Sequence, residues 1–389
     1  MRKISVLPFE RILNLEESNL LKEAVLKAIR VFESWGYNYL KLPYFEFYES
    51  QKKTLGDRIK DSITFKDPFT GELICLREDF TVQVVKSVSF LRTCQFPLRI
   101  YYFGTVFSVG DVLERFQTGI ELIGVPQVEG DAEVISAIYT YLKSLGFSNL
   151  KVSVGHIGVV EKVLLSVNNS KREIVRKAFK EKNLSLLRGI FGKDKRAELP
   201  LLQGGYEILN VLADIGFEEE RELLEMLGKL LDQADVNFSY DLAEVREFPY
   251  YTGIVFEIFT PDTGFPIAGG GRYDRLSEVY GESFAATGGT VYLDRVLSVT
   301  KPELCKKDFF ILDTTEGKKY GFKVASYLRS KGYKVGRDIV KRSLKHSLEY
   351  AFSEGYNRVV VIEDKGKVSI YTNTNEFISV NLKEFLKLF

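Results

Sequence analysis

The first part of the chain changes between helix-like and strand-like spacing of its apolar residues. Between Glu17 and Trp35 apolar residues recur at i, i+3 and i+4, and Gly36 follows as a stop, so the pattern predicts an amphipathic helix. Strand-like runs follow at residues 39–43, 62–66 and 72–76, and two longer runs lie at 98–107 and 116–124. The turn sequence DPFTG separates two of these runs, which is typical of an antiparallel sheet.

The pattern divides the rest of the chain into three further parts. Residues 148–235 are rich in Leu, Lys and Glu at helical spacing, which predicts a helical insertion. Strand signals return at residues 236–303, so the core formed by residues 1–147 continues there and is discontinuous in sequence. Residues 304–389 alternate strand, helix, strand, helix, strand, as in a small α/β domain. We therefore expect an α+β protein with an inserted helical domain and a C-terminal α/β domain.

Composition narrows the possible functions. The 54 basic and 53 acidic residues give a net charge of +1, so the whole molecule has no general attraction for nucleic acid or for a membrane surface. Three cysteines without a CxxC pair and two histidines, His156 and His346, predict neither a zinc site nor a disulfide framework. We expect both histidines to be structural. The short apolar start and the lack of a membrane span favour a cytoplasmic protein with no membrane partner.

Seven segments, in order, resemble the motifs of class II aminoacyl-tRNA synthetases of the histidyl type. They are GYNYLKLPYFE around Pro43, LREDFT, YYFGTVF, FQTGIELIG, REFPYYTGIVFE, GGGRYDRL and TGGTVYLDRV. The resemblance implies a class II antiparallel sheet flanked by helices and a homodimer formed through the segment around Pro43. It also implies that residues 304–389 are similar to the anticodon-binding domain of those synthetases.

The resemblance implies a site for free histidine. The residues that match the family's histidine ligands are Asp79, Thr81, Gln117, Glu121, Arg246, Tyr250 and Tyr251. Free histidine carries an ammonium, a carboxylate and an imidazole, so a selective site needs an acid, an arginine and a polar clamp. Gln117 and Glu121 have period-two spacing with Gly119 between them, so they share one face of a strand and the glycine leaves room for a ligand.

Each of these residues also has a purely structural interpretation. Asp79 and Thr81 precede an apolar helix and are candidate N-caps. The two tyrosines are compatible with ordinary strand aromatics, and Gln117 and Glu121 with a solvated strand face. Arg246 is a candidate partner in an ion pair, and the glycines at 269–271 are compatible with a bulge. Because all of these positions coincide with the histidine site of one family, we favour the functional interpretation.

The positions that match the family's ATP site depart from the family's pattern. Ser108 stands where the family has the arginine that binds the α-phosphate of ATP, and a serine cannot make bidentate, charge-assisted contacts with phosphate. Tyr292 replaces a small glycine where adenine is expected to lie, and Arg295 alone remains from that apparatus. No P-loop or GxGxxG segment offers another nucleotide site, and we expect no cofactor, no metal and no catalytic site.

A retained amino-acid pocket beside a dismantled nucleotide pocket resembles the regulatory subunits of short-form ATP phosphoribosyltransferase. That resemblance implies a non-catalytic subunit of the first step of histidine biosynthesis, with L-histidine as feedback ligand and a short catalytic subunit as partner. Two alternatives stay open: a histidine–tRNA ligase or specialised paralogue, and a stand-alone binding protein. Residues 305–389 carry 17 basic against 10 acidic residues, which keeps tRNA as a less favoured partner.

Overall fold

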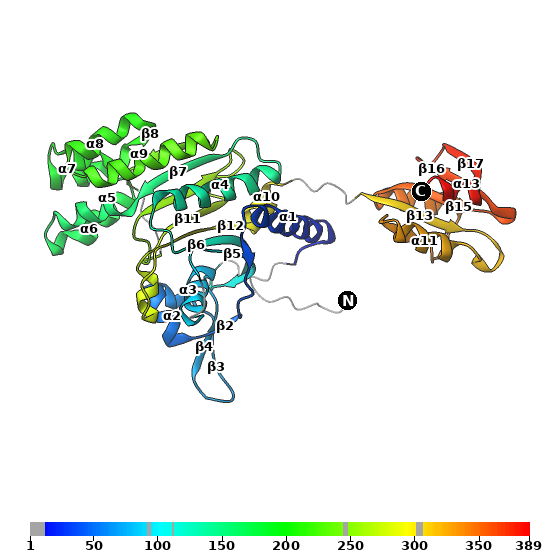
Figure 1. Cartoon of the computed structure of the whole chain (residues 1–389), viewed down its shortest axis with the longest axis horizontal. Coiled ribbons are helices and arrows are strands. Elements are labelled where there is room, and N and C mark those ends of the chain that lie inside the picture. The colour runs from blue at the N-terminus through cyan, green and yellow to red at the C-terminus, as the bar shows by residue number, and fades with distance from the viewer. Residues whose placement is uncertain (1–11, 92–94, 111–112, 244–247, 301–305) are drawn as a thin grey trace. The chain divides into compact units, whose positions relative to one another are not determined.

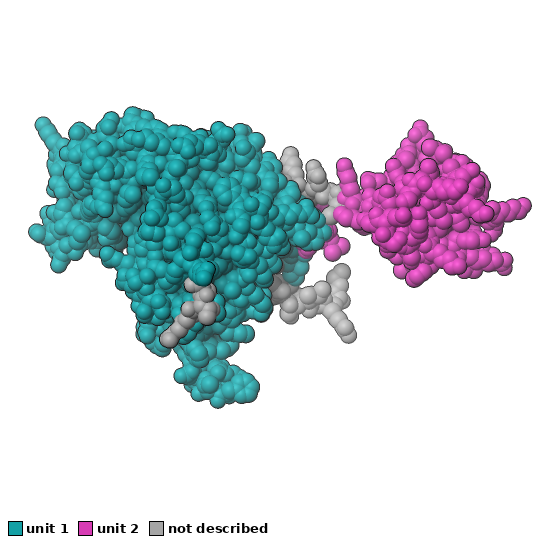
Figure 2. All heavy atoms as spheres, in the orientation of Figure 1, with its two compact units in different colours: residues 1–13, 20–300 teal, residues 14–19, 301–389 magenta. Residues whose placement is uncertain are grey.

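The computed structural model describes residues 12–91, 95–110, 113–243, 248–300 and 306–389. The chain forms two compact units, drawn teal and magenta in Figure 2. The larger unit contains most of the described residues up to Thr300, and the smaller contains those from Lys306 onward together with Asn14–Asn19.

A nine-stranded sheet forms the centre of the larger unit (Figure 1). In spatial order its strands are β1 (Asn38–Tyr39), β5 (Leu98–Phe107), β6 (Glu114–Ile123), β12 (Ala286–Tyr292), β11 (Ala268–Arg272), β10 (Ile254–Phe259), β7 (Lys151–His156), β9 (Phe238–Asp241) and β8 (Gln203–Gly204). The strands from β5 to β7 pair antiparallel, whereas β1 with β5 and β7 with β9 pair parallel. The predicted antiparallel sheet is confirmed, and the pairing of β6 with β12 joins the two separated parts of the core.

Helices cover both faces of this sheet. On one face, α1 (Leu15–Ser34) and α4 (Val128–Ser144) share a buried apolar cluster with Ile120 and Leu122 of β6. The other face packs against α3 (Phe80–Phe90), with Tyr102 of β5 and Ile123 of β6 in its core. Because side chains alternate along a strand, Glu121 faces the α3 side. The helix α10 (Leu293–Val299) follows β12 directly.

A small second sheet precedes α3. Its order is β2 (Phe45–Phe47), β4 (Leu73–Leu76) and β3 (Thr64–Lys66), with α2 (Tyr48–Leu55) and the 3₁₀ helix η1 (Gly56–Asp61) between β2 and β3. The strand expected at residues 39–43 is shorter than predicted, because only Asn38–Tyr39 pairs with β5. The strand β2 was not predicted.

The inserted segment enters through a strand before its helices begin. Val152 and Val154 are fully buried in β7, which pairs with β10 of the main sheet, so the segment expected to be helical from residue 148 begins as strand. The helices are α5 (Ile157–Leu165), α6 (Asn169–Lys180), α7 (Leu184–Phe191), α8 (Asn210–Asp214) and α9 (Glu218–Gln233). Their buried residues continue the same apolar cluster that lies between α4 and the sheet.

The smaller unit is the predicted α/β domain. Its sheet has the order β14 (Val335–Arg337), β13 (Lys307–Asp313), β15 (Tyr356–Ile362), β16 (Lys367–Tyr371) and β17 (Phe377–Asn381). The first three strands are parallel and the last two form an antiparallel hairpin, which was not predicted. α11 (Gly321–Ser330) and α13 (Leu382–Lys387) contribute to one core cluster and α12 (Leu344–Ser353) to another. Across the described ranges of both units, no helix combines the length and apolar character that crossing a membrane requires.

Candidate functional site

A cavity of about 390 Å³ opens on the α3 side of the main sheet. Five of the seven residues predicted to hold histidine line it: Asp79, Thr81, Gln117, Tyr250 and Tyr251. They come from the start of α3, from β6 and from the turn before β10. A cavity of this volume fits a small molecule such as an amino acid.

Asp79 combines a capping role with a place in the cavity. Its Oδ1 accepts a hydrogen bond of 3.0 Å from the backbone N–H of Val82, so it is the N-cap of α3, and its Oδ2 accepts one of 3.2 Å from the Tyr250 hydroxyl. Burial raises the pKa of the Asp79 carboxyl. The capping interpretation is therefore right for Asp79, and it coexists with exposure to the cavity.

Glu121 lies beneath the cavity and is not among its lining residues. Its Oε1 accepts hydrogen bonds from Thr81 at 2.7 Å and from Tyr102 at 3.1 Å, and its Oε2 accepts one from Tyr273. The side chain is fully buried, and that burial raises the pKa of its carboxyl to about 8. The interpretation of Glu121 as a residue on a solvated strand face is thus wrong. Its carboxyl connects three hydroxyl groups in one buried hydrogen-bond network beneath the cavity.

An aromatic wall closes one side of the cavity. The rings of Tyr250 and Tyr251 lie 4.9 Å apart, and Tyr250 makes edge contact with Tyr273 at 5.9 Å. Both tyrosines precede β10 and lie outside any strand, so they are not ordinary strand aromatics. Arg246, the remaining predicted ligand, lies outside the described residues.

Sequence reasoning missed Tyr273, which lines the cavity and donates to Glu121. Its signal was the GGGRYDRL segment, which resembles a family motif but from which only the glycines were considered for the ligand site. Those glycines form a regular part of β11, with no bulge. A Cβ atom at Gly270 would lie 2.1 Å from the carbonyl oxygen of Gly288, so the close approach of β11 and β12 requires glycine.

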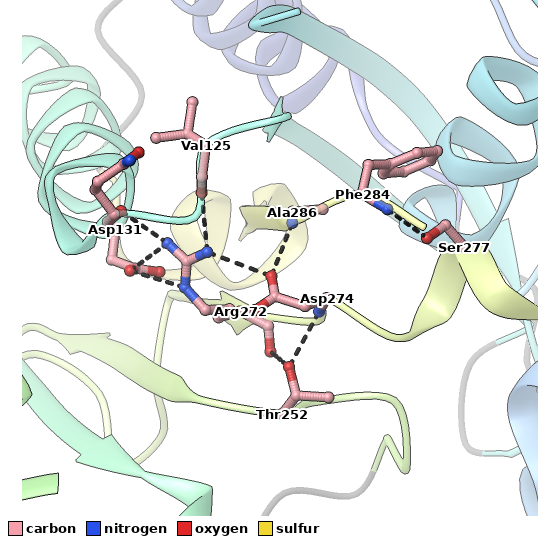
Figure 3. Close-up of polar contacts among 9 residues, drawn as sticks. Val125, Asp131, Thr252, Arg272, Asp274, Ser277, Phe284 and Ala286 are labelled. Carbon is pink, nitrogen blue, oxygen red and sulfur yellow. Dashed lines mark hydrogen bonds and ion pairs between the residues drawn. The ribbon is translucent and has the colours of Figure 1, made fainter. Parts of the chain in front are cut away.

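The residue before Tyr273 anchors this strand (Figure 3). The buried guanidinium of Arg272 donates to Oδ2 of Asp131 at 2.6 and 3.0 Å and to the carbonyl oxygens of Val125 and Gln127 at 2.9 and 3.0 Å. It also reaches Oδ1 of Asp274 at 3.3 Å. The network joins β11 to the start of α4 and thereby fixes the strand that carries Tyr273.

The three residues predicted to form a degraded ATP site, Ser108, Tyr292 and Arg295, make contacts within the chain. Ser108 Oγ accepts a hydrogen bond of 2.6 Å from the Arg115 guanidinium. Tyr292 lines the cavity, and the Arg295 guanidinium lies 4.4 Å from the centre of its ring. Arg295 also donates to the carbonyl oxygen of Pro266 at 2.7 Å. The cation–π and hydrogen-bond contacts hold Arg295 against the protein itself.

The two histidines have local structural contacts. Nδ1 of His156 accepts a hydrogen bond of 3.0 Å from the Gly158 backbone N–H and caps α5, and burial lowers the pKa of His156 to about 4. His346 lies on α12, with its Nδ1 2.9 Å from Ser343 Oγ. Among the residues that the structure describes, no group of three or more His, Cys, Asp or Glu side chains is arranged to hold a metal ion.

A family model described as histidyl-tRNA synthetase matches residues 11–296. An ATP phosphoribosyltransferase regulatory subunit from Aquifex aeolicus is 46% identical over 388 residues, which cover 99% of this chain and 99% of the relative. This chain belongs to the histidyl-tRNA synthetase family, among the ATP phosphoribosyltransferase regulatory subunits.

Both kinds of family member occur among the relatives. A histidine–tRNA ligase from Methanocaldococcus jannaschii is 32% identical over 372 residues, which cover 88% of this chain and 89% of the relative. The crystal structure of an ATP phosphoribosyltransferase regulatory subunit/histidyl-tRNA synthetase from Bacillus halodurans C superposes with a TM-score of 0.80 at 25% identity, covering 92% of this chain and 98% of that one. The fold is therefore that of a class II histidyl-tRNA synthetase, as predicted.

Proposed function

We propose that this chain is the non-catalytic, histidine-sensing regulatory subunit of an ATP phosphoribosyltransferase. One observation carries the proposal: an amino-acid-sized cavity lies beside a nucleotide half whose remaining arginine, Arg295, is held by Tyr292 and Pro266. The cavity suits histidine, and the neighbouring positions do not suit a triphosphate. In this account the chemistry of phosphoribosyl transfer belongs to a short catalytic subunit, and this chain regulates it.

The charges around the cavity match free histidine. Glu78, Asp79 and Glu257 line it and favour a cationic ligand such as an α-ammonium group. Tyr250, Tyr251 and Tyr273 supply aromatic faces and hydroxyls for an imidazole ring. We further propose that Gln117 and Arg246 contact the ligand, and that Glu121 acts on the imidazole through the Tyr273 and Thr81 hydroxyls.

Exposed aromatic residues near Pro43 support a homodimer. Phe45 and Phe47 are 55% and 51% exposed, and their register partners on β4, Leu76 and Ile74, share the same face of the small sheet. Apolar faces of this kind are typical of protein interfaces. We propose a homodimer through this region that joins catalytic subunits in a larger cytoplasmic complex.

Histidine–tRNA ligase is the second candidate, because residues 305–389 have a basic excess and a relative carries that name. One experiment separates the two. Purified full-length protein is titrated calorimetrically with L-histidine and with L-phenylalanine, which has a ring but no imidazole nitrogen, and is then assayed for ATP–pyrophosphate exchange with histidine and magnesium. We expect saturable histidine binding, no phenylalanine binding and background exchange. Exchange at synthetase rates would favour the ligase instead.

A further inference from the structure

The cavity holds two described cationic side chains, and they differ in how they are engaged. Arg295 is held by the Pro266 carbonyl oxygen and by the rings of Tyr292 and Phe265. Lys180, the last residue of α6, lines the same cavity from the helical insertion. Its side chain is exposed and has no hydrogen-bond or ion-pair partner among the described residues. A ligand that carries an anionic group would therefore meet an available cation only at Lys180 among the described lining residues.

The end of α6 fixes the direction from which Lys180 approaches. Lys182 has a positive φ of 50°, its N–H donates to the carbonyl oxygen of Phe179, and the N–H of Asn183 donates to that of Ala178. This pair of hydrogen bonds is a Schellman motif, which ends the helix in one defined geometry. Asn183 then caps α7 through its contact with the Leu186 N–H.

A second contact ties this turn to the main sheet. The Lys182 ammonium lies 3.3 Å from Oδ2 of Asp241, at the end of β9. The Asp241 side chain is 10% exposed, so the pair is shielded on the acid side. The turn is thus attached to the sheet, and the neighbouring Lys180 is free to reach into the cavity on its four-carbon stem.

We propose that Lys180 binds the α-carboxylate of the amino acid in the cavity, so that the helical insertion contributes a ligand contact. The inference rests on the proposed function, because it presumes an α-amino acid as ligand. The acids of the cavity select the ammonium end, and Lys180 supplies the opposite charge at the mouth. Ligand binding then adds a link between α6 and the strands of the core.

The test compares two ligands that differ only at the carboxyl carbon. L-Histidine and L-histidinol, in which the carboxylate is replaced by a hydroxymethyl group, are titrated into the full chain and into Lys180→Met. We expect the variant to bind histidine about five- to tenfold more weakly, and histidinol within about twofold of wild type. Lys180→Arg should restore most of the histidine affinity, because it returns the charge.

Lys177→Met is the matched control, since Lys177 lies one turn earlier on α6 and, within the described part of the chain, its ammonium pairs with exposed Glu181 at 3.8 Å. It should bind both ligands like wild type. Unchanged histidine affinity in Lys180→Met would overturn the inference, as would equal losses for histidine and histidinol, which would mark a structural role. Absence of histidine binding by the wild-type chain would overturn the proposed function and the inference together.

Discussion

Gly288 on β12 lies opposite Glu121 on β6, and a Cβ atom at position 288 would lie 1.6 Å from Oε2 of Glu121. Gly288→Ala must therefore displace Glu121 or part the two strands, since the Ile120 carbonyl oxygen is also within 2.7 Å of that Cβ. We expect the free energy of unfolding to fall by roughly 2–4 kcal/mol. We also expect histidine binding to become too weak to measure. Urea denaturation and calorimetry provide the two measurements.

Gly189→Ala is the control for that substitution. Gly189 lies within α7, and apart from its chain neighbours and the backbone of its own helix no atom lies within 4 Å of its ideal Cβ. Because alanine is favoured over glycine in a helix, this variant should gain about 0.5–1 kcal/mol in stability. A similar small gain for Gly288→Ala would contradict the packing described for Glu121.

Burial of the Glu121 carboxyl predicts a specific pH dependence of stability. Its folded-state pKa of about 8 is above the ordinary glutamate value of 4.5, so its contribution is fully present below the unfolded pKa and is lost as the pH rises through the folded one. Glu121→Gln does not titrate. The free energy of unfolding of the variant minus that of wild type should therefore increase between pH 5 and pH 8.5, by on the order of 1–3 kcal/mol. A difference independent of pH would contradict this assignment.

Burial of His156 predicts a pH dependence of stability with the opposite sign. Its folded-state pKa of about 4 is below the ordinary histidine value of 6.5, so its contribution is present above the unfolded pKa and is lost as the pH falls through the folded one. His156→Asn keeps a side chain that can cap α5 but removes the titration. Between pH 7.5 and pH 5 the variant should gain about 1–2 kcal/mol relative to wild type in urea denaturation. Parallel pH profiles for the two proteins would show that His156 is not responsible.

The Arg272 network should be more sensitive than an exposed pair of the same type. Arg272→Lys removes the planar fork that reaches Asp131 and two carbonyl oxygens, and we expect a cost of about 2–4 kcal/mol. Arg99 also donates two hydrogen bonds to one carboxylate, that of Glu133, but those side chains are 33% and 23% exposed. Arg99→Lys should cost less than about 1 kcal/mol. Equal losses of stability for the two variants in thermal or urea unfolding would contradict the claim that burial makes the Arg272 contacts more important.

The sequence predicted the elements whose periodicity is regular. The helix starting near Glu17 agrees with the structure because one of its faces is buried. The two long strands β5 and β6 agree because their apolar residues lie in a sheet that is covered on both faces. The strand β7 was missed because its alternating valines adjoin a Leu- and Lys-rich segment that has the spacing of helices.

The sequence could not show how deeply each site residue is buried or which distant segments of the chain meet at the site. Period-two spacing placed Glu121 on the correct face, but its position beneath the cavity depends on Thr81, Tyr102 and Tyr273, which come from three other segments. Lys180 belongs to the insertion, and no local pattern distinguishes it from the other lysines of that helix. Its place at the cavity follows from how the turn after α6 meets Asp241.

The central claim is that histidine in this cavity regulates a reaction carried out by another chain. The direct measurement is the rate of phosphoribosyl transfer from phosphoribosyl pyrophosphate to ATP by a short catalytic subunit, with and without this protein, across a histidine series. We predict that this protein raises the rate, and that histidine then inhibits the complex with a half-maximal concentration that follows the calorimetric Kd of this chain. A rate unaffected by this protein, or the same histidine inhibition in the catalytic subunit alone, would contradict the account.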